Sequence, residues 1–257
     1  MRILSLAWDA ATDAVGTIDA DALDLAQTLA RRGNDVHLLA AGGDAPTHAE
    51  DLGGVEVHWV GEAPPVIPDG DDALVPRVLA LNTRAFAAAA TLLRDVEVDV
   101  LLGHGWQTTY AAIHLRQSYD LALLAILDGT TNGRAGGELS GDALLVHQIE
   151  WWLTYEARRV VAASRHGAEE LREEFRLPPD KVEVIALPPR TSDGNLIAAA
   201  RRRLWGRRAW ADVADAYAAA LARAISDERE LLGVGADGPP LRQVLLRALD
   251  LEPAEGT

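Results

Sequence analysis

The sequence predicts an α/β fold, with a parallel sheet covered by helices on both faces and added helices near the carboxyl-terminal end. Two observations support this prediction. Over about residues 1–190, short apolar runs alternate with segments that carry apolar residues at helical spacing, as expected for consecutive strand–helix–strand units. Most of the apolar runs are continuous rather than alternating, which is typical of strands that are buried on both faces.

Seven segments are predicted as strands. Most are short apolar runs, and the third alternates as VEVHWV with the period of two that strands show. In chain order the predicted strands are Arg2–Ala7, Asp35–Ala40, Gly53–Val60, Asp99–Leu102, Leu121–Leu127, Arg159–Ala163 and Lys181–Ile185.

Five helices are predicted between these strands, from apolar residues that recur every three or four positions. The first ends at Gly33, a residue type that commonly stops helices. Composition marks two loops, because residues 61–72 are rich in Pro, Gly and Asp and residues 129–141 are rich in Gly. In chain order the predicted helices are Ile18–Arg32, Leu74–Arg94, Thr108–Ser118, Asp142–Tyr155 and His166–Phe175.

The pattern changes after Pro189. Residues 191–195 form a predicted turn, residues 196–226 are helix-like, and residues 233–240 form a break before a short helix that begins at Pro240. We therefore expect three parts along the chain. The first is a main domain at residues 1–190. The second is a helical segment at residues 191–230 that packs on it, and the third is a linker with a short helix at residues 231–257.

Composition excludes several classes of protein. The chain has 257 residues and no cysteine, so disulfides, thiolate metal sites and cysteine nucleophiles are excluded. The formal net charge is −15, and so negative a surface repels phosphate backbones and anionic lipids, which argues against nucleic-acid and membrane partners. No apolar run approaches the roughly 18 residues that span a bilayer, and the first ten residues lack a signal-peptide pattern. We expect a cytoplasmic protein.

Ligands of open parallel sheets bind beyond the carboxyl ends of the strands. The segments that follow Ala7, Leu102, Leu127 and Ile185 are therefore the places to look for a site. The seven histidines show no ligand spacing such as H-E-x-x-H, so no metal site is expected. Residues 233–238 fit G-x-G-x-x-G by letter, but no strand precedes them, and we interpret them as a linker.

Several strings resemble one enzyme family. MRILSLAWD, VGTI, LARRGNDVHLLA, QIEWWLTYEARRVVAASR and FRLPPDKVEVI resemble the amino-terminal domain of the retaining GT-B glycosyltransferases of family 4, the glycogen-synthase-like group. The resemblance covers about Met1–Ile185 and is most specific at QIEWWLTYEARRV. It implies one Rossmann-like, doubly wound domain here. In the family a second such domain faces it across a cleft, and that second domain holds most of the nucleotide-sugar donor.

The loop after the first strand departs from the family pattern. The family usually has W-E-[FY]-P-P followed by a Gly-Gly pair, whereas Trp8–Thr17 here lacks both prolines and the second glycine. Adjacent glycines let the backbone approach a donor phosphate at a helix start. Asp9, Gly16 and Thr17 are the candidate ligand contacts of this loop. The alternative is a plain capped helix, because the aspartates that follow would repel a phosphate.

Two further loops carry candidate residues. Where the family resembles H-A-H-D-W, this chain has Leu102–Trp106, which leaves His104 and Trp106 as ligand contacts or, alternatively, as packed residues. Where the family has a His at the end of the next strand, this chain has Asp128, which accepts hydrogen bonds but cannot be the same neutral donor. The alternative there is a simple Asp-Gly turn. The polar residues that remain for sugar contact after this position are Thr130, Asn132 and Arg134.

The segment after the last predicted strand departs most from the family pattern. The family commonly has P-N-G-V-D at the entry to its second domain, whereas this chain has Ala186–Arg190. We find no residues to match the paired glutamates and the donor-phosphate Arg and Lys of that domain. Trp210–Leu221 resembles the closing helix that crosses back onto the first domain in two-domain members. The Arg-rich run before it is either a docking patch or a solvated helix face.

The most specific string contains Glu150, Trp151 and Trp152. Two adjacent Trp residues on a helix cannot face the same way, so one is expected in the core and the other toward a neighbour or a cleft. Because tryptophan is common at binding hot spots, Trp151 and Trp152 are candidate interface residues, with core packing as the alternative.

These observations favour a degenerate, single-domain glycosyltransferase homologue without transferase activity. Its role would be binding or scaffolding, by self-association or as the partner of an intact glycosyltransferase. One alternative is an active minimal nucleotide-sugar glycosyltransferase or hydrolase that uses Asp128, His104 and Glu150 as catalytic residues together with Asp9. Another is a carbohydrate-binding module that binds glycan with Trp106 as a stacking platform. No cofactor is expected, apart from a nucleotide sugar in the active case.

Overall fold

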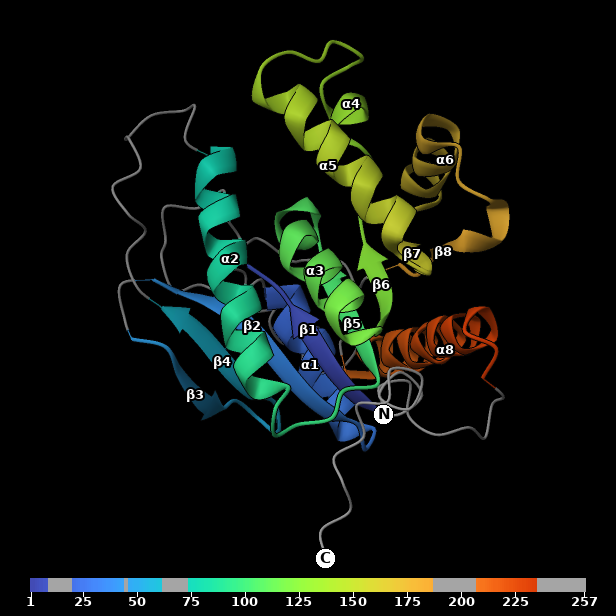
Figure 1. Ribbon diagram of the computed structural model, residues 1–257. Coiled ribbons are helices and arrows are strands. Elements are labelled where there is room, and N and C mark those ends of the chain that lie inside the picture. Colours follow the sequence, from blue (N-terminus) through green and yellow to red (C-terminus); the bar gives the residue numbers. More distant parts are fainter. Residues whose placement is uncertain (9–19, 44–45, 62–73, 187–206, 235–257) are drawn as a thin grey trace, which may run out of the picture.

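The computed structural model describes residues 1–8, 20–43, 46–61, 74–186 and 207–234. It shows an eight-stranded sheet between two layers of helices (Figure 1). The strand order is β3-β4-β2-β1-β5-β6-β7-β8, and every neighbouring pair is parallel except β3 and β4. The predicted α/β, Rossmann-like fold with a doubly wound sheet is therefore confirmed.

All seven predicted strands are present. β1 lies at the centre, and Ile3, Leu4 and Leu6 of this strand are fully buried, as the continuous apolar run predicts. The strands are β1 (Arg2–Leu6), β2 (Asp35–Gly43), β3 (His48–Asp51), β4 (Glu56–Gly61), β5 (Val100–His104), β6 (Ala122–Ile126), β7 (Arg159–Ala162) and β8 (Val182–Val184).

The edge strand β3 is a correction to the expectation of a purely parallel sheet. Its four residues, HAED, are all exposed, so the segment has neither the apolar run nor the alternation that predicts a strand. It is held by antiparallel pairing with β4 and by a hydrogen bond of 2.6 Å from Trp59 Nε1 to Glu50 Oε1. An edge strand of this kind is specified by its neighbour rather than by its own sequence.

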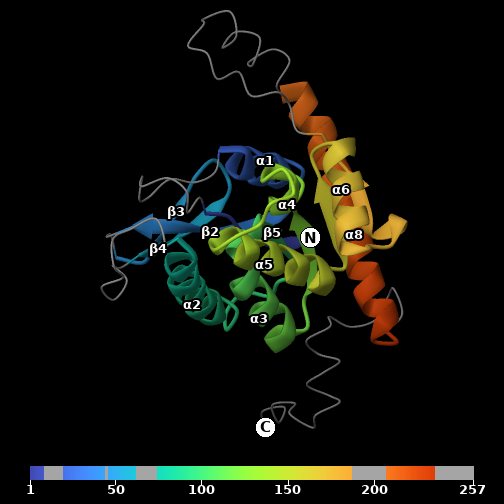
Figure 2. The ribbon, with the colours of Figure 1, turned by 90° about the horizontal axis from the view of Figure 1, so that it is seen from above.

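Two groups of helices cover the two faces of the sheet. α1 (Ala20–Arg31) and α8 (Arg207–Leu231) pack on one face, opposite the layer that contains α2 and α3 (Figure 2). Among the described helices, none has the length and apolar character that a bilayer-spanning segment needs. The helices of the second layer are α2 (Leu74–Leu92), α3 (Thr109–Tyr119), α5 (Asp142–Glu156) and α6 (Arg165–Phe175). The short elements are the 3-10 turns η2 (Trp106–Thr108) and η3 (Pro179–Lys181) and the helix α4 (Thr131–Arg134).

Helix α8 is attached to the sheet by both apolar and ionic contacts. Its buried residues include Ala214, Tyr217 and Leu221, which join the apolar cluster of α1 and the central strands. Glu228, which is 3% exposed, accepts a hydrogen bond of 3.1 Å from Arg158. The ion pairs at this helix include Arg158–Glu228, Arg116–Glu228, Arg159–Asp227, Arg223–Glu183 and Arg32–Asp215.

Some sequence predictions fall outside the described residues. Gly33 is described, and its φ of 82° fits the predicted helix stop. The predictions that lie outside are the first-strand loop from Asp9 on, with Gly16 and Thr17, residues 62–72 of the predicted loop at 61–72, residues 187–190, the turn at 191–195, the part of the Arg-rich run before Arg207 and the carboxyl-terminal helix.

We predict that Lys181, the single lysine of the chain, makes stability rise with pH. Burial, with further contributions from Arg158 and Arg116, lowers the pKa of Lys181 from 10.5 to about 8. Between about pH 8 and the pKa of the unfolded chain, the unfolded state binds more protons than the folded state, so stability increases as pH rises. The window for measurement ends near pH 10, because tyrosines titrate there.

The test compares the free energy of unfolding of the wild type and of Lys181→Arg from pH 7.5 to pH 10. Arginine stays charged throughout this range, so the variant cannot gain stability by losing its proton. We expect the free energy of unfolding of the wild type to rise with pH relative to that of Lys181→Arg. Parallel profiles for the two proteins would contradict the prediction.

Candidate functional site

The carboxyl ends of β1, β5, β6 and β7 form one edge of the sheet, because these strands are parallel neighbours. Figure 1 shows α4 and the amino-terminal end of α5 at this edge. The loops that leave these strands carry most of the residues that the sequence singles out. The geometry below is therefore that of the edge where open α/β sheets bind ligands.

His104 is the last residue of β5 and contacts the neighbouring strand. Its Nε2 lies 3.1 Å from the hydroxyl oxygen of Ser5 on β1, and Ser5 is 1% exposed. Gly105 follows with φ 71° and donates its N–H to the carbonyl of Ile126 on β6 at 2.9 Å. The structure thus places His104 at the expected edge, half-buried and bonded to the sheet itself.

Trp106 is packed between helices. Its side chain is 8% exposed and belongs to an apolar cluster with Val75 and Val78 of α2 and Val146 and Ile149 of α5. A sugar ring can stack only on an aromatic face that it can reach. The position of Trp106 therefore favours the packing alternative, and glycan stacking on this residue stays a prediction.

The loop after β6 turns at Gly129 and is capped by Thr130. Gly129 has φ 89°, and the buried Thr130 hydroxyl accepts the N–H of Gly133 at 3.0 Å at the start of α4. The same hydroxyl oxygen lies 3.0 Å from Glu170 Oε1 and 2.8 Å from Glu174 Oε2 on α6. A hydroxyl has one proton, so Thr130 donates to one of these carboxylates at a time.

Two glycines leave room for the Glu170 carboxylate between this loop and α6. A Cβ atom on Gly133 would lie 1.1 Å from Glu170 Oε1, and one on Gly129 would lie 2.5 Å from Glu170 Oε2. Glu170 and Glu174 are not among the residues that the sequence singles out. Their spacing of four on a helix places them on one face, but their target is set by the fold.

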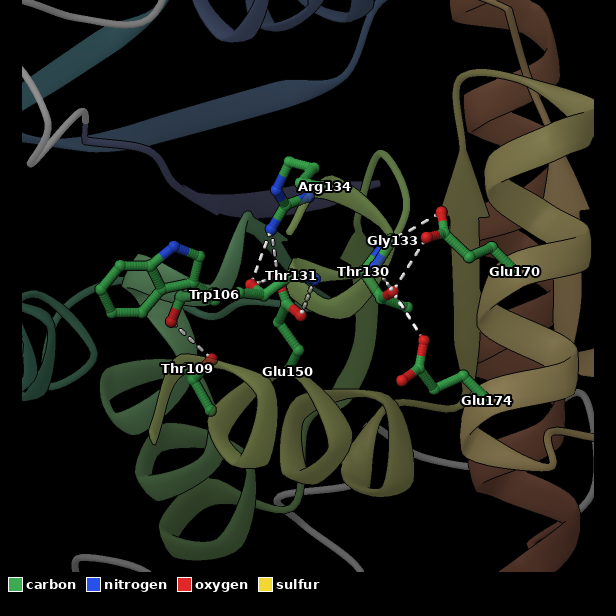
Figure 3. A network of polar contacts seen from close by, with 9 residues as sticks. All are labelled: Trp106, Thr109, Thr130, Thr131, Gly133, Arg134, Glu150, Glu170 and Glu174. Atoms are coloured by element: carbon green, nitrogen blue, oxygen red, sulfur yellow. Dashed lines mark hydrogen bonds and ion pairs between the residues drawn. The ribbon is translucent and has the colours of Figure 1, made fainter. Parts of the chain in front are cut away.

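Glu150 on α5 is the centre of the polar network at the edge (Figure 3). Its side chain is fully buried, and its carboxylate accepts three hydrogen bonds. The donors are the backbone N–H of Thr131 at 2.7 Å, the hydroxyl of Thr131 at 2.8 Å and the guanidinium of Arg134 at 2.5 Å. Hydrogen bonds to charged groups are the strong ones, so Glu150 fixes α4 in place.

Arg134 is anchored and still accessible. Its guanidinium donates to Glu150 and, at 2.9 Å, to the hydroxyl of Thr131, yet its side chain is 53% exposed. Asn132 on the same short helix is half-buried. Among the polar side chains that the structure describes at this edge, those of Arg134 and Asp128 are exposed, and those of Asn132 and His104 are half-buried.

Asp128 is exposed at the end of β6 and interacts with the opposite helix layer. Burial raises the pKa of Tyr217 on α8 well above its ordinary value, and the negative charges of Asp21 and Asp128 add to this rise. Asp128 therefore lies within electrostatic reach of Tyr217 on α8, whereas Glu150 belongs to α5.

Trp151 and Trp152 face different ways, as predicted. Trp152 is half-buried and meets Tyr110 edge-on, with ring centroids 5.3 Å apart. Trp151 is 44% exposed and stacks on Tyr155, with ring centroids 5.6 Å apart. The exposed residues at helical spacing on this helix, here called the α5 stripe, are Leu144, Gln148, Trp151 and Tyr155.

Comparison with known proteins gives the family. The model of Glycosyltransferase Family 4 matches residues 21–188, more than half of the chain. The chain belongs to Glycosyltransferase Family 4. An uncharacterised glycosyltransferase of Methanocaldococcus jannaschii is 28% identical over 185 residues, which are 72% of this chain and 45% of that protein. A glycogen synthase of Mycobacterium tuberculosis is 29% identical over 187 residues, which are 68% of this chain and 45% of that enzyme. The chain thus spans less than half the length of these relatives.

Solved structures share the fold. The sucrose-phosphate synthase of Thermosynechococcus elongatus matches with a TM-score of 0.58 at 16% identity, over 79% of this chain and 52% of that one. A UDP-glucosyltransferase of Polygonum tinctorium matches with a TM-score of 0.50 at 12% identity, over 77% of this chain and 55% of that one. The likeness confirms the GT-B-type Rossmann-like domain that the sequence predicts.

We predict that Glu150 is a structural residue whose loss destabilises the domain. In Glu150→Gln an amide NH₂ replaces one acceptor oxygen, and the donors of Thr131 and Arg134 cannot all be satisfied. The free energy of unfolding should fall by roughly 2–4 kcal/mol, since each buried group left without a partner costs about 1–3 kcal/mol.

The measurement is urea unfolding of the wild type, Glu150→Gln and the matched control Glu138→Gln. Glu138 is exposed in the segment after α4, so its substitution should change stability by no more than about 0.5 kcal/mol. Equal stability of all three proteins would remove Glu150 from this role.

Proposed function

We propose that this chain is a glycosyltransferase-family domain that transfers no sugar and acts as a binding or scaffolding protein, and that two copies associate through the α5 stripe. The observation that carries the first part is the environment of Glu150. Its side chain is fully buried, and both carboxylate oxygens accept hydrogen bonds from Thr131 and Arg134. A general acid or base must reach the proton of its substrate, and Glu150 can do so only if α4 is displaced.

A second catalytic candidate also has a structural partner. Nε2 of His104 lies 3.1 Å from the hydroxyl oxygen of the buried Ser5. Glycosyl transfer requires charge compensation of the donor diphosphate and an oriented acceptor. At the described part of the edge, the guanidinium of Arg134 already has Glu150 as its partner.

The α5 stripe supports self-association. Leu144, Trp151 and Tyr155 are 47%, 44% and 64% exposed, and Gln148 between them is uncharged. Two chains with a net charge of −15 repel each other, and this repulsion opposes contact least at a face without negative charge. The stripe is such a face.

Symmetry favours a second copy as the occupant of this stripe. A two-fold axis places the same patch of both subunits in contact. Two antiparallel α5 helices would bring Leu144 of one copy against Tyr155 of the other, with the two Trp151 side chains near the axis. Aromatic side chains in such central positions contribute most to binding.

One observation favours a second candidate function, a site for a nucleotide sugar or glycan. The guanidinium of Arg134 is more than half exposed and is oriented by Glu150 and Thr131. An oriented guanidinium is well suited to bind a phosphate or a sugar hydroxyl. In this case the chain would be an active enzyme or a carbohydrate-binding module.

Turnover and ligand binding distinguish the two candidates. We expect the purified chain to release no nucleoside diphosphate from the glucose conjugates of UDP, ADP and GDP. We also expect no rise in melting temperature with millimolar nucleotide sugar, because only a ligand that binds the native state raises it. Turnover, or a rise that Arg134→Ala abolishes and the exposed control Arg94→Ala keeps, would favour the second candidate.

The proposed dimer is tested by light scattering. The chain has a mass of 27.5 kDa, and we expect the wild type to scatter as twice that mass. Trp151→Ala and Tyr155→Ala should weaken the dimer about tenfold or more, the effect of losing a hot-spot side chain. The control Leu231→Ala changes a residue that is 65% exposed on α8 and should stay dimeric. A monomeric wild type, or unchanged dimers for both stripe variants, would contradict the proposal.

A further inference from the structure

Three side chains that commonly bind metals meet on β2 and β4, away from the carboxyl edge. The parallel register pairs His37 with Glu56 and Leu39 with His58. Residues two apart on a strand share one face, so His37, Glu56 and His58 lie on the same side of the sheet. Their ligand atoms all lie within 4.8 Å of one another.

The spacing of these atoms matches the ligand shell of a tetrahedral ion. His37 Nδ1 lies 3.1 Å from His58 Nε2 and 3.4 Å from Glu56 Oε2. His58 Nε2 lies 3.7 Å from Glu56 Oε1. Ligands at about 2.0–2.1 Å from a tetrahedral zinc ion are about 3.3 Å apart. The separations between the three side chains, of which those to Glu56 involve its two different carboxylate oxygens, are therefore close to the edge length of such a tetrahedron.

The surroundings fit a ligand role for both imidazoles. The side chains of His37 and His58 are 5% and 14% exposed. Burial lowers the pKa of His58, against the opposite effect of Glu56, which favours the neutral ring that metals bind. His37 Nε2 lies 3.6 Å from Asp35 Oδ1, and a carboxylate behind a histidine ligand is the usual outer partner that orients the ring.

A cation resolves a conflict among hydrogen-bond acceptors. If neutral His37 carries its proton on Nε2, facing Asp35, its Nδ1 is an acceptor. This acceptor faces a carboxylate oxygen of Glu56 as well as His58 Nε2. A proton on His58 Nε2 would satisfy only the contact with His37 Nδ1, whereas a shared metal ion would accept an electron pair from each of the three side chains.

We propose that His37, His58 and Glu56 bind one divalent transition-metal ion, with Zn²⁺ as the best match. Two imidazoles and one carboxylate are a common donor set for zinc, and three protein ligands leave a fourth position for water or an external ligand. The ion would join β4, and through it the edge strand β3, to β2. This site is independent of the carboxyl edge and of the α5 stripe.

The test is a titration of the full chain, first treated with a chelator and dialysed, with Co²⁺ and Zn²⁺. We expect one Co²⁺ per chain with the visible absorption of a tetrahedral ion, displacement of Co²⁺ by Zn²⁺, and a higher melting temperature with Zn²⁺. Absence of Co²⁺ absorption together with absence of Zn²⁺ binding by calorimetry would overturn the proposal.

Variants locate the ion. His58→Ala and His37→Ala should weaken Zn²⁺ binding by more than about 100-fold, and Asp35→Asn by about tenfold, since the loss of an outer partner alone costs 10–100-fold. Glu56→Gln, at a residue with half its side chain exposed, tests the third ligand with little risk to folding. His114→Ala, at an exposed histidine on α3, should bind as the wild type does.

Folding of each variant is checked by circular dichroism before titration. If His37→Ala does not fold, His58→Ala and Glu56→Gln decide the question. Wild-type affinity in both of these variants, or an equal loss in His114→Ala, would place the ion elsewhere and overturn the assignment.

Discussion

The parallel pairing of β1 with β2 and β5 is the constraint on which the rest of the structure depends. Parallel strands require crossover connections, so every loop that follows a parallel strand leaves from the same edge. This pairing brings His104 beside Ser5, and the pairing of β2 with β4 brings His37 opposite Glu56. A shift of one residue in either register would turn these side chains to the other face. The contact of His104 with Ser5 and the histidine cluster are therefore both products of strand register.

The buried carboxylate of Glu150 holds the carboxyl edge in a fixed arrangement and is itself not available for proton transfer. A charge taken out of water is costly unless it is paired and hydrogen-bonded, and Thr131 and Arg134 supply those partners. The result is a fixed α4 that holds Arg134 at the surface. Thr130, Glu170 and Glu174 fix the same loop from α6. Groups with so many fixed partners suit a rigid binding surface better than proton transfer.

The fold was predictable from sequence because burial on both faces leaves a clear pattern. The strands of the central sheet are continuous apolar runs, and the helices between them repeat apolar residues at helical spacing. β3 and α4 were not predictable for a common reason. β3 is exposed and exists through its pairing with β4. α4 consists of Thr, Asn, Gly and Arg, and tertiary bonds to α5 and α6 hold it.

The site was predictable only in part, for similar reasons. The rule that ligands bind at the carboxyl edge located the loops of His104, Asp128 and Thr130 correctly on the sheet. It could not show that Glu150 is fully engaged or that Trp106 is packed, because both facts depend on contacts between helices. The cluster of His37, Glu56 and His58 has no spacing along the chain that predicts it. It arises from the register of two strands.

The net charge of −15 bears differently on the two kinds of ligand. A strongly negative protein concentrates cations near its surface and repels anions. A divalent ion at His37 and His58 gains from this field, and Glu56 and Asp35 add negative charge close by. The diphosphate of a nucleotide sugar is repelled by the same field. At the described part of the edge, the guanidinium of Arg134 could attract the diphosphate, but it is already paired with Glu150. The electrostatics of the chain thus favour the metal ion over the nucleotide, unless further positive charge is supplied at the edge.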